Sequence, residues 1–298
     1  MKKIGIGLYG TNGHQVQGQL AANSHAELRA VAAVDTAKLP ESLRGVRLYA
    51  TLDEMLKDPG VELVSLCSPR RADQADEAIR CLKAGKHVYG EKPSAMTERD
   101  LDRIIETSGK TGKIYHEMAG TVVQQPYMKM RDVVKSGVLG TVVQVLVQKC
   151  YHWHDARPKD EDIDGGLALQ VGVYAGRFVE HIACEKIKTL KIAETRLGDS
   201  RPDSDCRMAV SMIMELNNGG LASAVCNYLN PMQKKCWGYE ILRIFGTAGI
   251  VESSFETGKA RLLLKGAEPE ELKLSPPTIS YFDLFVRSIH GEVEMPLG

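Results

Sequence analysis

The sequence of 298 residues has no excess of either charge, because 38 Lys and Arg balance 38 Asp and Glu. A neutral chain lacks the basic surface that nucleic acids require, so we expect no nucleic-acid partner. No apolar run approaches the roughly 20 residues of a membrane-spanning helix, and we expect no membrane contact. The seven cysteines form no C-x-x-C pair, and the N-terminus does not read as a signal peptide. Both features predict free thiols and a cytoplasmic location.

The first 119 residues alternate short apolar runs with helical patterns. We expect strands over residues 3–9, 28–34, 63–67, 87–89 and 114–118. Helices are expected over 15–22 and 72–84, and a further helix begins after Thr97 as its N-cap. A repeated strand–helix–strand order requires parallel crossovers. Residues 1–119 are therefore predicted to form an α/β domain with a doubly wound parallel sheet.

The pattern changes over residues 120–298. Helices are expected over 126–136, 166–184 and 282–289, whereas strands dominate between residues 189 and 265. A long alternating run over 141–154 adds one more strand, and glycine-containing turns at 217–220 and 246–249 read as hairpin connections. This part is predicted to be an α+β domain with a large, mostly antiparallel open sheet.

Glycines gather on the first strand, as Gly7, and in the turn that follows it. The turn residues are Gly10, Thr11, Asn12, Gly13 and His14. Glycine lets the backbone approach a pyrophosphate closely, and the helix N-terminus that follows favours an anion. The turn departs from the G-x-G-x-x-G fingerprint at its second and third glycines, where Asn12 and Gln15 stand. It predicts a dinucleotide site, with a purely structural turn as the alternative.

Asp35 ends the second expected strand, 22 residues after Gly13. This is near the spacing at which a carboxylate hydrogen-bonds the ribose of a bound dinucleotide. A carboxylate there disfavours a 2′-phosphate, so NAD is favoured over NADP. The alternative is that Asp35 only caps the end of the strand.

A second motif is longer and more specific. Residues 84–93 read Ala-Gly-Lys-His-Val-Tyr-Gly-Glu-Lys-Pro, and residues 67–69 read Cys-Ser-Pro. With this motif the chain closely resembles the glucose–fructose oxidoreductase and inositol dehydrogenase family (Gfo/Idh/MocA). The resemblance covers the N-terminal domain well, then residues 165–166 and the helix after them, and the C-terminal sheet more loosely.

The resemblance implies a Rossmann domain that binds NAD, followed by a domain whose open sheet joins a homodimer or homotetramer. It also implies a cis peptide bond before Pro93, and a Lys92 side chain that reaches the nicotinamide and the substrate. The cofactor-binding residues expected from the turn and from the resemblance are Gly7, Gly10, Thr11, Asn12, Gly13, His14, Asp35, Cys67, Ser68, Pro69, Glu91 and Lys92.

The expected helix over 166–184 carries an apolar stripe at residues 167, 171, 175, 178 and 182. Gln170, Tyr174 and Arg177 repeat that spacing as a polar stripe, which faces either a cleft or solvent. Relatives read D-x-G-x-H-x-x-D here, with tyrosine in place of the histidine in some members. Tyr174 matches that variant and is the implied acid/base. Gln170 cannot ionise and can only orient a hydroxyl, while Arg177 reverses a charge.

Cys150, His152 and His154 would share one face of a strand. Residues four apart on a strand lie about 13 Å apart, too far to bind one ion together, so no metal is expected. We interpret the two histidines as substrate contacts, with surface or core histidines as the alternative. Arg157 suits a carboxylate or phosphate, or is a surface arginine. The arginine pair at residues 70–71 is expected to be solvated, with contacts to the cofactor phosphates as the alternative.

These observations predict an enzyme, an NAD-dependent oxidoreductase that moves a hydride between nicotinamide and a secondary alcohol or ketone of a sugar- or polyol-like substrate. Lys92 would stabilise the alkoxide and Tyr174 would exchange the proton. The expected substrate contacts are Lys92, His152, His154, Arg157, Gln170 and Tyr174. Two alternatives stay open. One is a dinucleotide-binding member without turnover, acting as a sensor or partner subunit. The other is redox-assisted sugar elimination or hydrolysis with NAD recycled in place.

Overall fold

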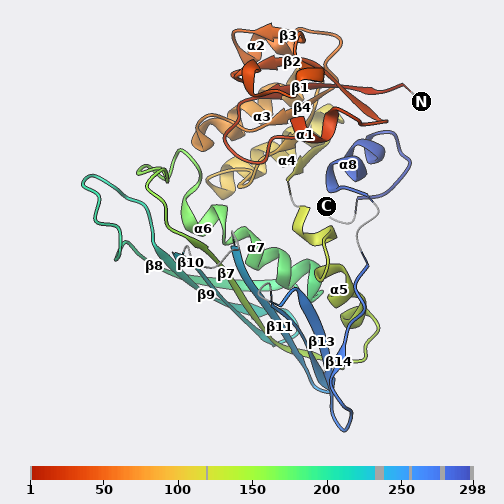
Figure 1. The fold of residues 1–298 in the computed structure, drawn as a ribbon, viewed down its shortest axis with the longest axis vertical. Coiled ribbons are helices and arrows are strands. Elements are labelled where there is room, and N and C mark those ends of the chain that lie inside the picture. The colour runs from red at the N-terminus through yellow and green to blue at the C-terminus, as the bar shows by residue number, and fades with distance from the viewer. Residues whose placement is uncertain (1, 119, 232–237, 255–256, 276–278, 296–298) are drawn as a thin grey trace. The chain divides into compact units, whose positions relative to one another are not determined.

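The computed structural model describes residues 2–118, 120–231, 238–254, 257–275 and 279–295. The chain folds as two units (Figure 1). The first comprises Met1–Ala119, Asp162–Gly165 and Ile279–Gly298, and the second comprises Gly120–Glu161 and Gly166–Thr278. Two later segments of the chain therefore complete the first unit.

Six strands form the sheet of the first unit, in the order β3-β2-β1-β4-β5-β6. They are β1 (Ile4–Tyr9), β2 (Ala26–Ala32), β3 (Arg47–Tyr49), β4 (Leu63–Leu66), β5 (His87–Gly90) and β6 (Tyr115–Glu117). Every neighbouring pair is parallel, which confirms the predicted doubly wound sheet. β4 is buried throughout, as expected of a strand covered on both faces. The strand order reverses between β1 and β4, where such sheets bind ligands.

The helices of the first unit are α1 (Gln17–Leu20), α2 (Leu52–Leu56), α3 (Gln74–Lys83), α4 (Glu98–Thr111) and α8 (Tyr281–Ile289), with 3-10 turns η1 (Thr36–Lys38), η2 (Glu41–Leu43) and η3 (Arg71–Asp73). The predicted cap at Thr97 is confirmed, since its hydroxyl oxygen accepts a hydrogen bond from the Asp100 N–H at 3.1 Å. α1 is shorter than the predicted helix over 15–22. The Gln15 side chain accepts the Val16 N–H at 3.0 Å, so regular helix begins only at Gln17.

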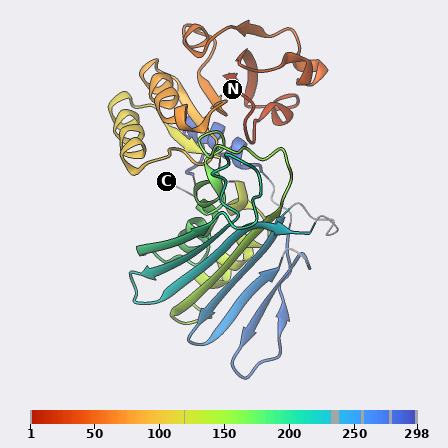
Figure 2. The same ribbon diagram turned by 90° about the vertical axis from the view of Figure 1, so that its left-hand side faces the viewer.

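Eight strands form the sheet of the second unit, in the order β14-β13-β12-β11-β7-β10-β9-β8 (Figure 2). They are β7 (Val142–His152), β8 (Ile187–Thr195), β9 (Ala209–Leu216), β10 (Leu221–Asn230), β11 (Gly238–Gly246), β12 (Gly249–Ser254), β13 (Lys259–Leu264) and β14 (Glu270–Glu271). Only the β7–β10 pair is parallel among the pairings described, which confirms the mostly antiparallel sheet. The helices α5 (Tyr127–Lys135), α6 (Gly166–Gln170) and α7 (Val173–Arg177) lie along one face, and the short turn η4 (Gly120–Val123) precedes α5 (Figure 1).

The single helix predicted over 166–184 is wrong. The chain forms α6, then α7, then the π-helical turn η5 (Phe178–Ile182). Gly172 lies at the break, where a Cβ would be 2.1 Å from the Ala168 carbonyl oxygen and 2.2 Å from Cε of Met212 on β9. The predicted apolar stripe is nevertheless buried throughout. Within the described part of the chain, no helix is both long and apolar enough to cross a bilayer.

Candidate active site

The turn after β1 has a backbone conformation that glycine adopts readily. Gly10 has a φ of +68° and Gly13 a φ of +133°. A Cβ on Gly10 would lie 2.0 Å from the carbonyl oxygen of Cys67, which follows β4. The turn therefore runs against the carboxyl ends of β1 and β4, at the point where the strand order reverses.

Glu91 and Lys92 follow β5 beside this turn. The buried Glu91 carboxylate accepts the backbone N–H of His14 and lies 2.9 Å from Nδ1 of its ring. Burial raises the pKa of Glu91, but the bonds and charge of His14 and the charge of Lys92 outweigh it and hold the pKa below its ordinary value. Lys92 is only 6% exposed, and its Nζ lies 4.0 Å from Oε1 of Glu91. The Lys92–Pro93 bond is cis, as the resemblance implied.

Arg71 and Gln74 join the turn to this segment, and neither was predicted to do so. The Arg71 guanidinium donates to the Asn12 carbonyl oxygen at 2.5 Å and to Oε1 of Gln74 at 2.6 Å. Gln74 in turn donates to the carbonyl oxygens of Glu91 and Pro93, at 2.5 and 2.9 Å. Both side chains are buried, so the expectation that the arginine pair is solvated is wrong for Arg71. The network fixes Lys92 relative to the glycine turn.

The two positions that depart from the glycine fingerprint carry part-buried side-chain hydrogen bonds. The Gln15 amide donates to the Gly10 carbonyl oxygen at 3.0 Å and accepts the Ser65 hydroxyl at 2.5 Å, which ties the start of the helix to β1 and β4. The Asn12 amide donates to the carbonyl oxygen of Ile163 at 2.5 Å. Asn12 and Gln15 thus hold the turn by side-chain hydrogen bonds, where the fingerprint glycines would allow close backbone packing.

The shape of this turn fits a dinucleotide, because Gly10 and Gly13 both have positive φ at the switch point of the sheet. The Glu91 carboxylate lies against Gly13, 2.5 Å from where a Cβ would be. Asp35 follows β2 with an exposed side chain, and its carboxylate accepts the Ala37 N–H at 3.0 Å as the cap of η1. Gly7 lies inside β1, where a Cβ would meet the side chains of Met55 and Val61 at 3.0 Å.

The other predicted cofactor residues differ in exposure. Thr11 and Pro69 are exposed, whereas Cys67 and Ser68 are buried. Burial, and then the negative charge of Glu91, raise the pKa of the Cys67 thiol, so it stays protonated and packs rather than reacts.

Four predicted substrate residues lie in the second unit, and two of them, Arg157 and Gln170, contact Tyr228. The Arg157 guanidinium stacks on the Tyr228 ring with Cζ 3.6 Å from the centroid, and the Tyr228 hydroxyl lies 3.5 Å from Oε1 of Gln170. Nη2 of Arg157 donates to the His152 carbonyl oxygen at 3.1 Å. The rings of His152 and His154 are 6.2 Å apart. Arg157 is 9% exposed, which contradicts its interpretation as a surface arginine.

β7 ends at His152, so His154 lies in the turn beyond the strand rather than on a shared strand face. Burial, and then the charges of Arg157 and His152, lower the pKa of His154, which keeps its imidazole neutral near pH 7. Among the residues with a described placement, no group of three or more His, Cys, Asp or Glu side chains could hold a metal ion.

Tyr174 on α7 is buried beside a charged pair that was not predicted. The Lys149 ammonium lies 3.9 Å from the centroid of the Tyr174 ring and pairs with Glu240 on the neighbouring strand β11. The Tyr127 hydroxyl also donates to Glu240. Burial, and then the phenols of Tyr174 and Tyr228, raise the pKa of Tyr151. The Lys149 ammonium thus makes a cation–π contact with the face of the Tyr174 ring.

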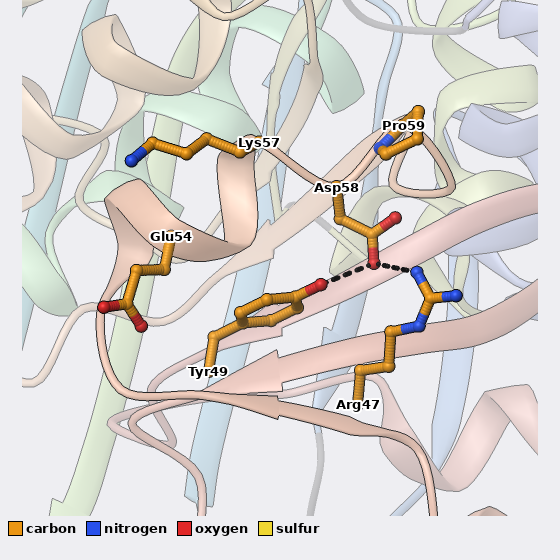
Figure 3. A pocket seen from close by; sticks show the side chains of 6 residues that line it. All are labelled: Arg47, Tyr49, Glu54, Lys57, Asp58 and Pro59. Atoms are coloured by element: carbon orange, nitrogen blue, oxygen red, sulfur yellow. Dashed lines mark hydrogen bonds and ion pairs between the residues drawn. The ribbon is translucent and has the colours of Figure 1, made fainter.

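A hollow elsewhere on the first unit contains none of the predicted site residues (Figure 3). Its lining residues are Arg47, Tyr49, Glu54, Lys57, Asp58 and Pro59. The Asp58 carboxylate accepts hydrogen bonds from Nη1 of Arg47 and from the Tyr49 hydroxyl, both at 3.0 Å. The buried acid is thus satisfied by the protein, and we assign no ligand to this hollow.

Two profiles of one family match the chain. The profile described as "Oxidoreductase family, NAD-binding Rossmann fold" matches residues 4–118, and the GFO/IDH/MocA C-terminal domain matches residues 127–252. The chain therefore belongs to the Gfo/Idh/MocA family, as its motif at residues 84–93 implied.

Individual relatives are distant. An uncharacterized oxidoreductase of Rhizobium meliloti is 30% identical over 214 residues, which cover 67% of this chain and 63% of the relative. A myo-inositol 2-dehydrogenase of Thermotoga maritima is 24% identical over 218 residues, or 71% of this chain and 62% of that protein. The match thus spans less than two thirds of either relative. The solved aldose-aldose oxidoreductase of Caulobacter crescentus shares the fold, with a TM-score of 0.82, 22% identity and coverage of 99% of this chain and 91% of that one.

Proposed function

We propose that this protein is an NAD-dependent oxidoreductase acting on a secondary alcohol, or the corresponding ketone, of a sugar- or polyol-like substrate. The observation that carries the proposal is the burial of Lys92 beside Glu91, whose carboxylate bonds to the glycine turn at His14. A lysine held inside the protein next to a cofactor-type turn suits a catalytic role better than a solvated one. The relative named a myo-inositol 2-dehydrogenase supports a polyol-like substrate.

The cofactor part of the proposal rests on the shape of the turn. Gly10 and Gly13 would hold the pyrophosphate, and the exposed carboxylate of Asp35 would bind the ribose and favour NAD over NADP. Bound nicotinamide supplies the acceptor for the hydride of the substrate carbinol.

The protein's own groups would handle the proton and the charge. The Lys92 ammonium would stabilise the alkoxide that develops as the hydride leaves, and Tyr174 would exchange the hydroxyl proton. The cation–π contact with Lys149 positions the Tyr174 ring. The side chains of His152, His154, Arg157 and Gln170 would orient the substrate.

We extend the proposal to a homodimer or homotetramer formed through the large sheet of the second unit. Large apolar side chains are exposed on β7, β8, β9 and β10; they are Val143, Leu190, Ile192, Ile213, Leu221, Val225 and Leu229. Exposed apolar groups of this number on one sheet are typical of an association surface.

A second candidate function is dinucleotide binding without turnover. Gln170 stands where relatives carry an acid, and its amide oxygen accepts the Tyr228 hydroxyl at 3.5 Å. In this case the purified protein would carry dinucleotide and oxidise no sugar or polyol. A gain of sugar oxidation in Gln170→Asp would support lost catalysis, whereas a loss of activity would support a specialised active site.

The test is a screen of sugars, polyols and their keto forms with NAD, followed by the absorbance of reduced nicotinamide. Lys92→Ala should lower turnover about 10²- to 10⁴-fold while leaving NAD affinity nearly unchanged. Lys83→Ala removes an exposed lysine from α3 of the same unit and serves as the matched control. Unchanged turnover in Lys92→Ala would remove Lys92 from the mechanism.

A further inference from the structure

Arg157 is a buried cation without an acidic partner. The residue is 9% exposed, and among the described residues no carboxylate pairs with its guanidinium. Nη2 donates to the His152 carbonyl oxygen and Cζ stacks on Tyr228, but the buried Nε finds no acceptor. A guanidinium is always charged, and a buried charge without a counter-ion is costly. The arrangement therefore leaves a positive charge that an anion would compensate.

No carboxylate of the described residues lies within ion-pair distance of the Arg157 guanidinium; the exposed Asp155, two residues earlier, acts on His154 and Arg201 instead. Arg201 donates to the Arg157 carbonyl oxygen at 2.6 Å, yet its own charge is satisfied by Asp199 through two hydrogen bonds of 3.0 and 3.1 Å. Tyr228, on which Arg157 stacks, meets the neutral amide of Gln170. The aromatic ring and the carbonyl oxygen that contact Arg157 are both uncharged. The contacts described for the Arg157 guanidinium itself thus carry no negative charge.

We infer that the substrate carries a carboxylate that Arg157 binds, which makes it a sugar acid rather than a neutral polyol. The inference rests on the proposed function and narrows its substrate class. Arginine recognises carboxylates through paired N–H donors in one plane, and Nη1 has no protein acceptor among the described residues. Gln170 and His154, both close to Arg157 or to its stacking partner, offer neutral donors and acceptors for hydroxyl groups.

The charge count favours a carboxylate over a phosphate. A phosphate monoester carries a charge of about −1.5 to −2 near neutral pH, whereas a carboxylate carries one negative charge. The single uncompensated guanidinium matches the latter. The neighbouring cation, Arg201, is already neutralised by Asp199 and would add little to a dianion site.

The experiment compares matched acids and neutral sugars. With saturating NAD, kcat/KM is measured for glucuronate against glucose, galacturonate against galactose, and glucose 6-phosphate as the phosphate arm. Isothermal calorimetry measures binding of the same compounds without turnover. R157Q removes the charge, and R157K keeps the charge but loses the paired N–H donors of the guanidinium. R196Q is the control, because it removes an exposed charge from the same unit. Urea unfolding of each variant monitors the fold.

We expect the native protein to favour the acids by at least about 10-fold, and R157Q to reduce the acid-to-neutral ratio by about 10- to 100-fold, with R157K between them and R196Q unchanged. Equal use of acids and neutral sugars, an equal loss on both in R157Q, or preference for the phosphate would overturn the inference. If R157Q does not fold, R157K and the native preference decide. Uronate binding that R157Q abolishes, without oxidation of any sugar, would refute the proposed function and leave the inference standing.

Discussion

Replacing Gly10 by alanine tests the geometry on which the cofactor site depends. The added Cβ would lie 2.0 Å from the Cys67 carbonyl oxygen, a backbone atom that no rotamer change can move, in a residue with a φ of +68°. Gly112→Ala is the matched control, because Gly112 has a φ of +65° and nothing within 4 Å of its added Cβ. Left-handed backbone costs alanine about 1–2 kcal/mol, and the lower entropy of the unfolded chain returns about 0.4–1 kcal/mol. We therefore expect Gly112→Ala to lose about 1 kcal/mol or less.

Gly10→Ala should lose a further 1–3 kcal/mol or so, because the ends of β1 and β4 must separate to admit the methyl group. Urea unfolding followed by circular dichroism measures both free energies of unfolding, and calorimetry with NAD measures the accompanying loss of cofactor affinity. Equal stability of the two variants would refute the close approach of the glycine turn to Cys67, and with it the cradle proposed for the pyrophosphate.

Three further outcomes are expected. Asp35→Ser keeps a side-chain cap but removes the carboxylate, so the kcat/KM ratio of NAD to NADP should fall, and an unaltered ratio would defeat the ribose assignment. Ile213→Glu places a charge on the open sheet and should reduce the molecular mass measured by light scattering. Ile105→Glu is the control, because Ile105 is 61% exposed and Ile213 is 60% exposed. An unchanged mass for Ile213→Glu would exclude the sheet as the association surface. Burial, and then the charge of Lys113, lower the pKa of His87 to about 4. Between pH 6.5 and 4 the unfolded chain therefore binds the proton more readily than the folded protein does. The free energy of unfolding decreases as the pH is lowered through that window. The loss of unfolding free energy between pH 7.5 and 5 should be about 1 kcal/mol smaller in His87→Gln than in the native protein, after allowance for solvent screening. An identical loss in the two proteins would contradict the lowered pKa of His87.

The fold was predictable wherever local patterns agree with the tertiary structure. Apolar runs separated by helical patterns predicted the parallel sheet, and Thr97 marked the start of α4. The helix over 166–184 was predicted wrongly, because its apolar stripe is continuous while a tertiary contact, the approach of Gly172 to Met212, interrupts the helix. β3 has two of its three residues exposed, so it carries no apolar run that a sequence could reveal.

The site was predictable only where a motif named it. The motifs predict Lys92 and the glycine turn as site residues, and these stay predictions. Arg71 and Gln74 left no signal, because the sequence does not distinguish a buried polar residue from an exposed one. Lys149 did leave a signal. It alternates with Val145 and Val147 on one face of β7, so a charge falls on an otherwise apolar face, and Glu240 lies opposite it in the β11 register.

The short segment Asp162–Gly165 has a practical consequence for anyone dissecting the gene. Its carbonyl groups accept the backbone N–H of Arg71 and Ala72, at 3.1 and 3.0 Å, and its Ile163 oxygen also holds the Asn12 amide. A fragment that stops at residue 119 would leave the backbone N–H groups of Arg71 and Ala72 and the Asn12 amide without these acceptors. The glycine turn would lose that support. Any minimal cofactor-binding fragment should therefore graft back those four residues together with the segment that carries α8, because both belong to the first unit.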